Sequence, residues 1–408
     1  MHDSTAPGRR VPPALLALMI GAFGIGMTEF IVAGLLPEIG RDLGVSLSSA
    51  GLLVSGYAAG VAVGAPLLTG LTGRVDRKTL LLALMGIFIV GNLAGALAPS
   101  YEVLMLSRVV AAFAHGTFFA VGAIVATQVV APGRGAGAIA MMFTGLTFAN
   151  VAGVPAGTLI GQNLGWRATF WVITAVGIIG AVLIGVLVPR LPVIEPASIR
   201  RELGVLRRPQ VLLALAMTLF GYGGIFVAFT FIAPILQDIS GFAPSMVTVL
   251  LVLFGLGLVV GNTVGGRLAD RNVMRTLLGV LALLSGVLAV FSVTASNQVA
   301  AAVTVFLLGA AGFGTVPGLQ LRVVQKAEGA PNVASAMNIA AFNVGIAGGA
   351  LLGGFVVDSP LGLGSTPWVG ALVTLVGLVL AALSALMDRR PGASTPASAD
   401  SPADLARV

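Results

Sequence analysis

The sequence predicts an all-α membrane protein whose twelve transmembrane helices form two pseudo-symmetric bundles of six. The chain of 408 residues is 57% hydrophobic and only 9% charged, which lies outside the composition of a soluble globular domain. Twelve apolar runs are each long enough to cross about 30 Å of hydrocarbon, a distance that takes about 20 helical residues. The second half of the chain also repeats features of the first half.

Short polar segments separate the apolar runs and set their approximate bounds. The runs lie at 13–37, 48–71, 79–98, 103–128, 136–161, 168–188, 211–237, 244–266, 275–294, 298–320, 333–357 and 367–387. We therefore expect an N-terminal bundle over 13–188, a basic linker over 189–210, a C-terminal bundle over 211–387 and a disordered tail over 388–408. No small-residue cleavage site follows the first run, which indicates a retained helix and not a signal peptide.

The basic residues predict the orientation. With the N-terminus in the cytoplasm, 19 of the 22 Lys and Arg residues fall in cytoplasmic segments; Arg41 and Arg167 fall outside and Arg108 falls within a span. The positive-inside rule then predicts that both termini are cytoplasmic. The linker carries five Arg against two Glu, which suits a segment that lies against anionic headgroups or is solvated. The net charge of +7 thus reflects topology, and we expect no nucleic-acid partner.

An internal repeat relates the two bundles. A shift of 197 residues aligns Gly60–Leu81 with Gly257–Leu278. The Asn150-Val151 pair also recurs in the second half as Asn343-Val344. Parallel six-helix repeats are typical of transporters that hold substrate where the repeats meet, near the membrane midplane. The repeat therefore predicts transport by alternating access.

Glu29 is an acid in the middle of the first apolar run. A carboxylate at bilayer depth costs at least about 2.5 kcal/mol, so such residues usually mark an ion or substrate pathway. Arg108, in the fourth run, lies at a similar depth, and His115 follows it two helical turns later. A carboxylate beside an arginine stays ionised, whereas one separated from it in an apolar surrounding takes up a proton more readily. We predict that these three residues couple transport to protons; a static Glu29–Arg108 pair and a packing role for His115 are the alternatives.

Substrate is expected between Glu29, Arg108 and side chains chosen by their depth in the spans. The aromatic candidates are Tyr57, Phe118, Phe119, Tyr222, Phe226, Phe229 and Phe342, and the amide candidates are Asn338 and Asn343. Core packing or lipid contact is the commoner role of any single aromatic residue here. Amides in hydrocarbon need polar partners, which makes the two Asn residues better candidates for contact.

At several segments the chain resembles the major facilitator superfamily, and the resemblance covers 13–388 and implies the fold of that family. Segments 70–78 and 266–271 are similar to its signature between helices two and three, whose Asp meets a helix N-terminus and Arg residues in the outward-facing state. Position 73, where the signature has its Asp, is Gly in this chain, and Asp76 lies three residues after it. The resemblance therefore assigns the role of that Asp to Asp270 in the second copy. Positive-inside topology alone is the alternative. The conformational-switch residues implied by the resemblance are Arg74, Asp76, Arg77, Asp270 and Arg271.

Two further segments are similar to motifs of the superfamily. Segment 106–116 resembles the motif whose buried Arg is implicated in proton coupling, and segment 145–161 resembles the antiporter motif, which implies export. Pro155 removes a backbone hydrogen bond and the glycines leave a smooth groove, so this helix can bend or slide where the halves meet. Ordinary small-residue packing is the alternative. The motif residues are Gly145, Asn150, Gly153, Pro155 and Gly157.

Segments 26–39, 115–116 and 153–157 are similar to the twelve-span drug:proton antiporters, notably the arabinose-efflux-like and chloramphenicol-exporter groups. This resemblance implies proton-coupled efflux of a small amphipathic compound, with an antibiotic such as an amphenicol as one cargo and antibiotic resistance as the outcome. A sugar or nucleoside efflux permease and an uncoupled facilitator are the alternatives.

The residue inventory argues against an enzyme. The spans hold no second acid, no histidine cluster, no phosphate-binding loop and no Ser-His-Asp set, and the chain has no Cys. We therefore expect a monomer in the plasma membrane that binds a small molecule and protons. We expect neither a metal nor a cofactor, with the proton gradient as the energy source.

Overall fold

The computed structural model describes the chain except for residues 1–11, 73–74, 132–133, 192–202, 329 and 389–408. The described residues form helices and short connections without strands, and twelve helical segments are long and apolar enough to cross a membrane. The predicted all-α class with twelve spans is confirmed. Arg74, much of the expected linker and all but the first residue of the expected tail lie outside the described residues.

Seven α-helices and one π-helical turn make up the first part of the chain, which we call the N-half. They are α1 (Pro13–Leu43), α2 (Leu47–Leu71), α3 (Arg77–Ala96), α4 (Tyr101–Gln128), α5 (Gly135–Phe148), η1 (Ala149–Gly153), α6 (Val154–Leu164) and α7 (Trp166–Leu187).

The second part, the C-half, follows the short 3-10 helix η2 (Leu203–Arg207). It comprises α9 (Pro209–Phe229), α10 (Ile232–Pro234), the π-helical turn η3 (Ile235–Ile239), α11 (Pro244–Arg271), α12 (Val273–Thr294), α13 (Gln298–Gly314), α14 (Val316–Lys326), α15 (Pro331–Asp358), the 3-10 helix η4 (Leu363–Ser365) and α16 (Thr366–Asp388).

The first helix is longer than its apolar run predicts. Pro37 lies inside α1 without ending it, and the helix stops only at Gly44, whose φ of 64° is a left-handed conformation that glycine adopts without strain. As a result Glu38 and Asp42 belong to the same helix as Glu29. The Glu38 side chain is only 13% exposed, so the expectation of a single acid within the spans is corrected to include it.

Three predicted spans are interrupted next to a proline. A proline supplies no N–H to the carbonyl four residues earlier, and its ring crowds that carbonyl. The π-helical turn η1 precedes Pro155 in α6, a turn at Thr230–Phe231 precedes Pro234 in α10, and α13 gives way to α14 just before Pro317. The helix of the antiporter-like motif, which was expected to bend or slide, is thus interrupted by a π-helical turn directly before the segment that contains Pro155.

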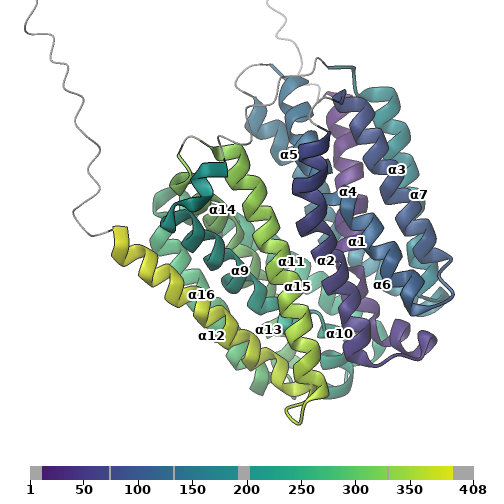
Figure 1. Ribbon diagram of the computed structural model, residues 1–408. Helices are drawn as coiled ribbons and strands as arrows, with labels where there is room; N and C mark the ends of the chain where they lie inside the picture. Colours follow the sequence, from purple (N-terminus) through teal and green to yellow (C-terminus); the bar gives the residue numbers. More distant parts are fainter. Residues whose placement is uncertain (1–11, 73–74, 132–133, 192–202, 329, 389–408) are drawn as a thin grey trace, which may run out of the picture.

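The internal repeat is visible in how the helices pack. In the N-half α2 packs on α4, α3 on α7, and α1 on both α5 and α7. In the C-half α11 packs on α13, α12 on α16, and α9 on both α15 and α16. Each pair occupies the corresponding place in its half, which confirms two pseudo-symmetric bundles. Figure 1 shows the N-half in purple to blue and the C-half in teal to yellow.

The two halves meet through α2 against α15 and through η1 and α6 against α11. Two hydrogen bonds join the halves within the described residues: Ser55 Oγ donates to the Ala347 carbonyl oxygen (2.9 Å) and Gln162 Nε2 donates to that of Pro244 (3.0 Å). The Gln162 bond joins the last turn of α6 to the first residue of α11. Toward the upper end, near α5 and α14, the halves are splayed apart.

Candidate functional site

Arg108 joins α4 to α1 in the interior of the N-half. Its side chain is almost fully buried, with a residue exposure of 1%. Nη1 donates to the Thr28 carbonyl oxygen (2.5 Å) and to the Thr28 hydroxyl (3.2 Å), and Nη2 donates to the Glu29 carbonyl oxygen (3.3 Å). The guanidinium also lies 4.1 Å from the centroid of the Tyr57 ring. Backbone carbonyl oxygens of α1 and the face of the Tyr57 ring thus stabilise the positive charge of Arg108.

The Glu29 carboxylate is not one of the partners of Arg108. Among the described residues it forms no ion pair and no hydrogen bond, and the residue is partly exposed. It lies within electrostatic range of Arg108 and Tyr57 in the N-half and of Tyr222 in the C-half. The structure therefore brings Glu29 and Arg108 together through the backbone of residue 29, and it leaves the carboxylate free beside both halves.

Polar contacts continue on either side of Arg108. On one side the Thr28 hydroxyl donates to Asn92 Oδ1 in α3 (2.6 Å), and on the other the Tyr57 hydroxyl and His115 Nδ1 lie 3.2 Å apart. The resulting chain of side chains links α3, α1, α4 and α2. Thr28 and Asn92 were not among the residues predicted from the sequence, although a polar residue directly before Glu29 and an amide within an apolar span were available signals.

Six aromatic side chains of the C-half form a cluster that we call the aromatic box. Four helices, α9, α11, α13 and α15, supply its members: Tyr222, Phe226, Phe229, Phe254, Phe313 and Phe342. Their ring centroids lie between 4.3 and 6.3 Å apart in successive pairs. Four of the six were predicted as substrate contacts, and the structure brings those four together.

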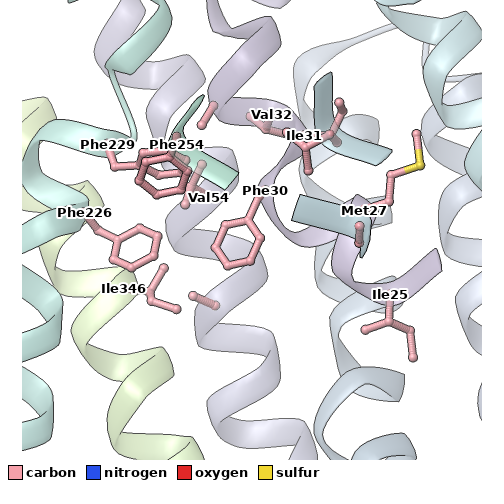
Figure 2. Close-up of a cluster of buried hydrophobic side chains, with 14 of the residues drawn as sticks. Ile25, Met27, Phe30, Ile31, Val32, Val54, Phe226, Phe229, Phe254 and Ile346 are labelled. Atoms are coloured by element: carbon pink, nitrogen blue, oxygen red, sulfur yellow. The ribbon is translucent and has the colours of Figure 1, made fainter. Parts of the chain in front are cut away.

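Phe30 of the N-half inserts its ring into this box. It is stacked on Phe226, with centroids 6.2 Å apart and planes at 21°, and it meets Phe229 and Phe313 edge-on at 6.3 and 6.4 Å. Figure 2 shows the ring pointing from α1 toward Phe226, Phe229 and Phe254, close to Val54 of α2 and Ile346 of α15. Phe30, which follows Glu29 directly, was not among the predicted residues because nothing in its own segment distinguishes it from any other Phe in a span.

The remaining predicted aromatic residues lie inside the N-half. Phe118 is fully buried with its ring against Gly21 of α1, and Phe119 packs on His115 and is stacked on Phe143 at 5.0 Å. These contacts are those of core residues, and the structure does not bring the two rings to the aromatic box.

The two predicted amides are both buried. Asn338 is fully buried: its Oδ1 accepts from the Thr218 hydroxyl (2.7 Å) and its Nδ2 donates to Gln320 Oε1 (2.7 Å). Asn343 donates to the Ile339 carbonyl oxygen (2.9 Å), while its own Oδ1 is buried without a partner in the part of the chain that the structure describes. The Asn338 amide is thus already satisfied by a network within the C-half.

The antiporter-like segment packs its glycines on α1. A Cβ added at Gly145 would collide with the Met19 carbonyl, and one at Gly153 would lie 3.0 Å from the Phe23 ring. One added at Gly157 would meet Ile31 and Met27. The π-helical turn meets α11 across the two halves, where a Cβ at Gly255 would lie 2.8 Å from both the Asn150 oxygen and the Val151 Cα.

Arg74 lies outside the described residues, and the other predicted switch residues form no hydrogen bond or ion pair with the opposite half in the part of the chain that the structure describes. Asp76 caps α3, where its Oδ1 accepts from the Thr79 N–H (2.9 Å), and that hydrogen bond holds the pKa of the carboxyl below its usual value. Arg77 is buried at the start of α3. Asp270 and Arg271 are exposed at the end of α11, and neither forms an ion pair with another described residue.

Comparison with known proteins gives consistent matches over nearly the whole chain. The profile of the Major Facilitator Superfamily matches residues 18–340. The inner membrane transport protein YdhP of Escherichia coli K12 is 46% identical over 371 residues, covering 91% of this chain and 95% of YdhP. A chloramphenicol resistance protein of Streptomyces lividans is 36% identical over 377 residues, covering 91% of this chain and 96% of that protein.

Among solved structures, a bacterial homolog of the human lysosomal transporter Spinster, in its inward-facing and unoccupied conformation, matches with a TM-score of 0.67. The match covers 91% of this chain and 95% of the homolog at 15% identity, and it shows a shared fold. The family profile and the relatives support the expectation of a transporter that spans the plasma membrane several times.

Proposed function

The chain belongs to the Major Facilitator Superfamily, and on that premise we propose that it exports a small amphipathic compound in exchange for protons by alternating access. The observation that carries the proposal is the free Glu29 carboxylate. Because Arg108 is engaged by the α1 backbone and the Tyr57 ring, Glu29 can gain or lose a proton without breaking an ion pair. The proton gradient is then the energy source, and no cofactor takes part.

Movement of the halves would change the surroundings of this carboxylate. Tyr57 belongs to the N-half and Tyr222 to the C-half, and both lie within electrostatic range of Glu29. When the halves move relative to each other, the distance to Tyr222 changes while that to Tyr57 is kept within one bundle. A group whose surroundings differ between two conformations binds its proton with different affinity in each, which is the requirement for coupling.

We also propose which end of the molecule faces the outside of the cell. With both termini in the cytoplasm, the end where Gln162 meets Pro244 faces outward, so the halves are closed toward the outside and splayed toward the cytoplasm. A single chain contains both halves and the Glu29 carboxylate, so a monomer is sufficient for transport. The aromatic box and the fully bonded Asn338 favour a cargo less polar than a sugar. The name of the Streptomyces relative points to amphenicols as one group to test.

Everted membrane vesicles provide the test. A growth screen of an efflux-deficient host with antibiotics, dyes, sugars and nucleosides first identifies a cargo, and its uptake into vesicles is then driven by an imposed gradient, acid inside. We expect Glu29→Gln to abolish accumulation against a concentration gradient while exchange of labelled for unlabelled cargo continues. Glu102→Gln, which changes an exposed acid of α4, serves as the matched control. Undiminished accumulation by Glu29→Gln would show that protons do not drive transport through this residue.

A further inference from the structure

Four buried side-chain oxygens lie without a partner on three helices that pack together, α1, α6 and α11. They are Glu38 Oε2, Thr158 Oγ1, Gln162 Oε1 and Thr248 Oγ1, and we call these four residues the seam site. None of the four atoms forms a hydrogen bond within the part of the chain that the structure describes. Thr158 is fully buried. Because buried polar atoms are nearly always bonded, four such atoms on neighbouring helices indicate a ligand.

The register of α1 against α6 places Glu38 beside Gln162, which is 124 positions later in the chain. Two contacts with the same separation bracket this pair: a Cβ on Gly34 would collide with the Thr158 hydroxyl, and Asp42 Oδ2 accepts from Trp166 Nε1 (3.0 Å). The helices run in the same direction because they belong to the first and fifth spans. Glu38 lies one turn from each of the two contacts, so its side chain is level with that of Gln162.

Helix α11 approaches the same place from the C-half. Gln162 Nε2 donates to the Pro244 carbonyl oxygen (3.0 Å), and a Cβ on Gly34 would lie 3.0 Å from Leu251. Thr248 lies between Pro244 and Leu251 on the same face of α11, because residues three and four apart are neighbours on a helix. The seam site is therefore built by both halves, with three residues from the N-half and one from the C-half.

The seam site offers the ligands that hard cations prefer. Such cations bind through oxygen, whereas nitrogen and sulfur ligands suit the softer metals. The Gln162 amide oxygen can only accept, since the amide nitrogen donates to Pro244. A single carboxylate balances one positive charge, and α1 packs so closely here that Gly34 has no room for a Cβ. A small monovalent cation meets both conditions.

Protein groups compensate the charge of Glu38 only weakly. Its other oxygen, Oε1, lies 3.7 Å from Arg41 Nη2. The Arg41 side chain is 72% exposed, against 13% for that of Glu38, so water screens the attraction. A water molecule would also meet the four oxygens, but it would leave the charge of a buried carboxylate without a counter-charge. The charge therefore favours a cation as the ligand.

We propose that the seam site binds one sodium ion and that the bound ion holds the two halves together at this end of the molecule. Separation of the halves carries Thr248 away from the other three ligands, so the ion binds the closed seam more tightly and favours it. No metal was expected from the sequence, because one acid and three neutral oxygens on distant segments form no motif. Under the proposed function this end faces outward and the ion comes from outside the cell; only that statement rests on the proposed function.

The first measurement is thermal unfolding of the purified full chain in lipid nanodiscs, without cargo and without a proton gradient. NaCl replaces choline chloride at constant ionic strength, and the rise in Tm gives the apparent Kd for sodium. We expect a saturable rise in Tm with NaCl. We expect a smaller rise with KCl at the same concentrations, because the larger ion fits the closely packed helices less well.

Variants locate the ion. Glu38→Gln keeps the size of the side chain but removes its charge, and it is expected to raise the apparent Kd about 10-fold or more. Thr158→Val and Thr248→Val each remove one ligand oxygen and are expected to raise it about 3-fold. Glu102→Gln, at an exposed acid of α4, and Thr263→Val, at an exposed hydroxyl of α11, are the matched controls and should keep the wild-type Kd. The Tm in choline chloride identifies any variant that fails to fold.

The second measurement follows closure of the seam. In a chain without native cysteine, Ser55→Cys and Ala347→Cys place one thiol in each half, where the Ser55 hydroxyl bonds to the Ala347 carbonyl oxygen. NaCl is expected to raise the rate of disulfide formation between them at least about 3-fold over choline chloride. Glu38→Gln is expected to remove this increase.

Three results would overturn the inference. Equal effects of NaCl and choline chloride on Tm would leave water as the partner of the four oxygens, an undiminished sodium effect in Glu38→Gln would place the ion elsewhere, and equal cross-linking rates would show that the ion does not close the seam. Neither measurement uses cargo or a gradient. Gradient-driven export without a sodium effect therefore removes only this inference, whereas a sodium effect without gradient-driven export removes only the proposed function.

Discussion

Replacement of Thr28 by Val tests the polar chain that connects α3, α1 and α4. The two side chains have nearly the same shape, so the substitution removes a hydroxyl without leaving a cavity. Asn92 Oδ1 then loses the Thr28 donor at 2.6 Å, while Arg108 keeps its bonds to the carbonyls of residues 28 and 29. A buried polar atom left without a partner costs about 1–3 kcal/mol, and hydrogen bonds between membrane helices contribute up to about 1.7 kcal/mol. We expect a loss of about 1–2 kcal/mol in the free energy of unfolding.

The measurement is unfolding in mixed detergent micelles titrated with dodecyl sulfate and followed by tryptophan fluorescence. Thr263→Val is the control, because this exposed hydroxyl donates only to a carbonyl of its own helix. A cycle that combines Thr28→Val with Asn92→Leu measures the coupling between the two side chains. An unfolding cost of Thr28→Val no larger than that of the control, or a coupling energy of zero, would contradict this prediction.

Two further predictions concern the α3 cap and the contact between the halves. Asp76→Ala is expected to lower unfolding free energy by about 1 kcal/mol at pH 7, the usual contribution of a cap. The folded-state pKa of Asp76 lies below the unfolded value of about 3.9. The ionised carboxylate therefore stabilises the folded protein fully at pH values above about 3.9, and this stabilisation is lost as the pH falls through the lowered pKa. The difference between wild type and Asp76→Ala should therefore shrink in unfolding titrations repeated below about pH 4, and a difference that stays constant would contradict this account. Gly255→Val places a side chain on the backbone of the other half, whereas a Cβ at Gly279 meets open space. In a chain without native cysteine, Gly255→Val should reduce disulfide cross-linking between Ser55→Cys and Ala347→Cys at least several-fold relative to Gly279→Val, and equal cross-linking would contradict it.

Much of the fold could be predicted because the determinants are local. Apolar length defines each span, and the effect of Pro155 on its helix was anticipated from the missing N–H. The same reasoning applies to Pro234 and Pro317, which interrupt α9–α10 and α13–α14, so these interruptions were predictable as well. The end of α1 was not, since Pro37 is tolerated within that helix and the stop comes from Gly44.

The site was predictable only in part. The depth of Glu29 and Arg108 in their spans predicted that they lie near each other. The hydrogen-bond partners of the guanidinium could not be predicted, because they are backbone carbonyl oxygens, which every residue has and which leave no signal in the sequence. Phe30 was hidden for a different reason. A Phe within an apolar run can face lipid, its own bundle or the other half, and the choice depends on packing between segments about 200 residues apart in the chain.

The contact of Arg108 with α1 also bears on how this protein can change during evolution. Two of its three hydrogen bonds to α1 end on main-chain oxygens, which persist whatever side chain stands at positions 28 and 29. The joint between α1 and α4 therefore does not depend on the identity of the acid. A lineage can lose, move or replace the carboxylate at position 29 while the bundle stays assembled. Under the proposed function, the energy source of transport is then free to diverge on a preserved scaffold.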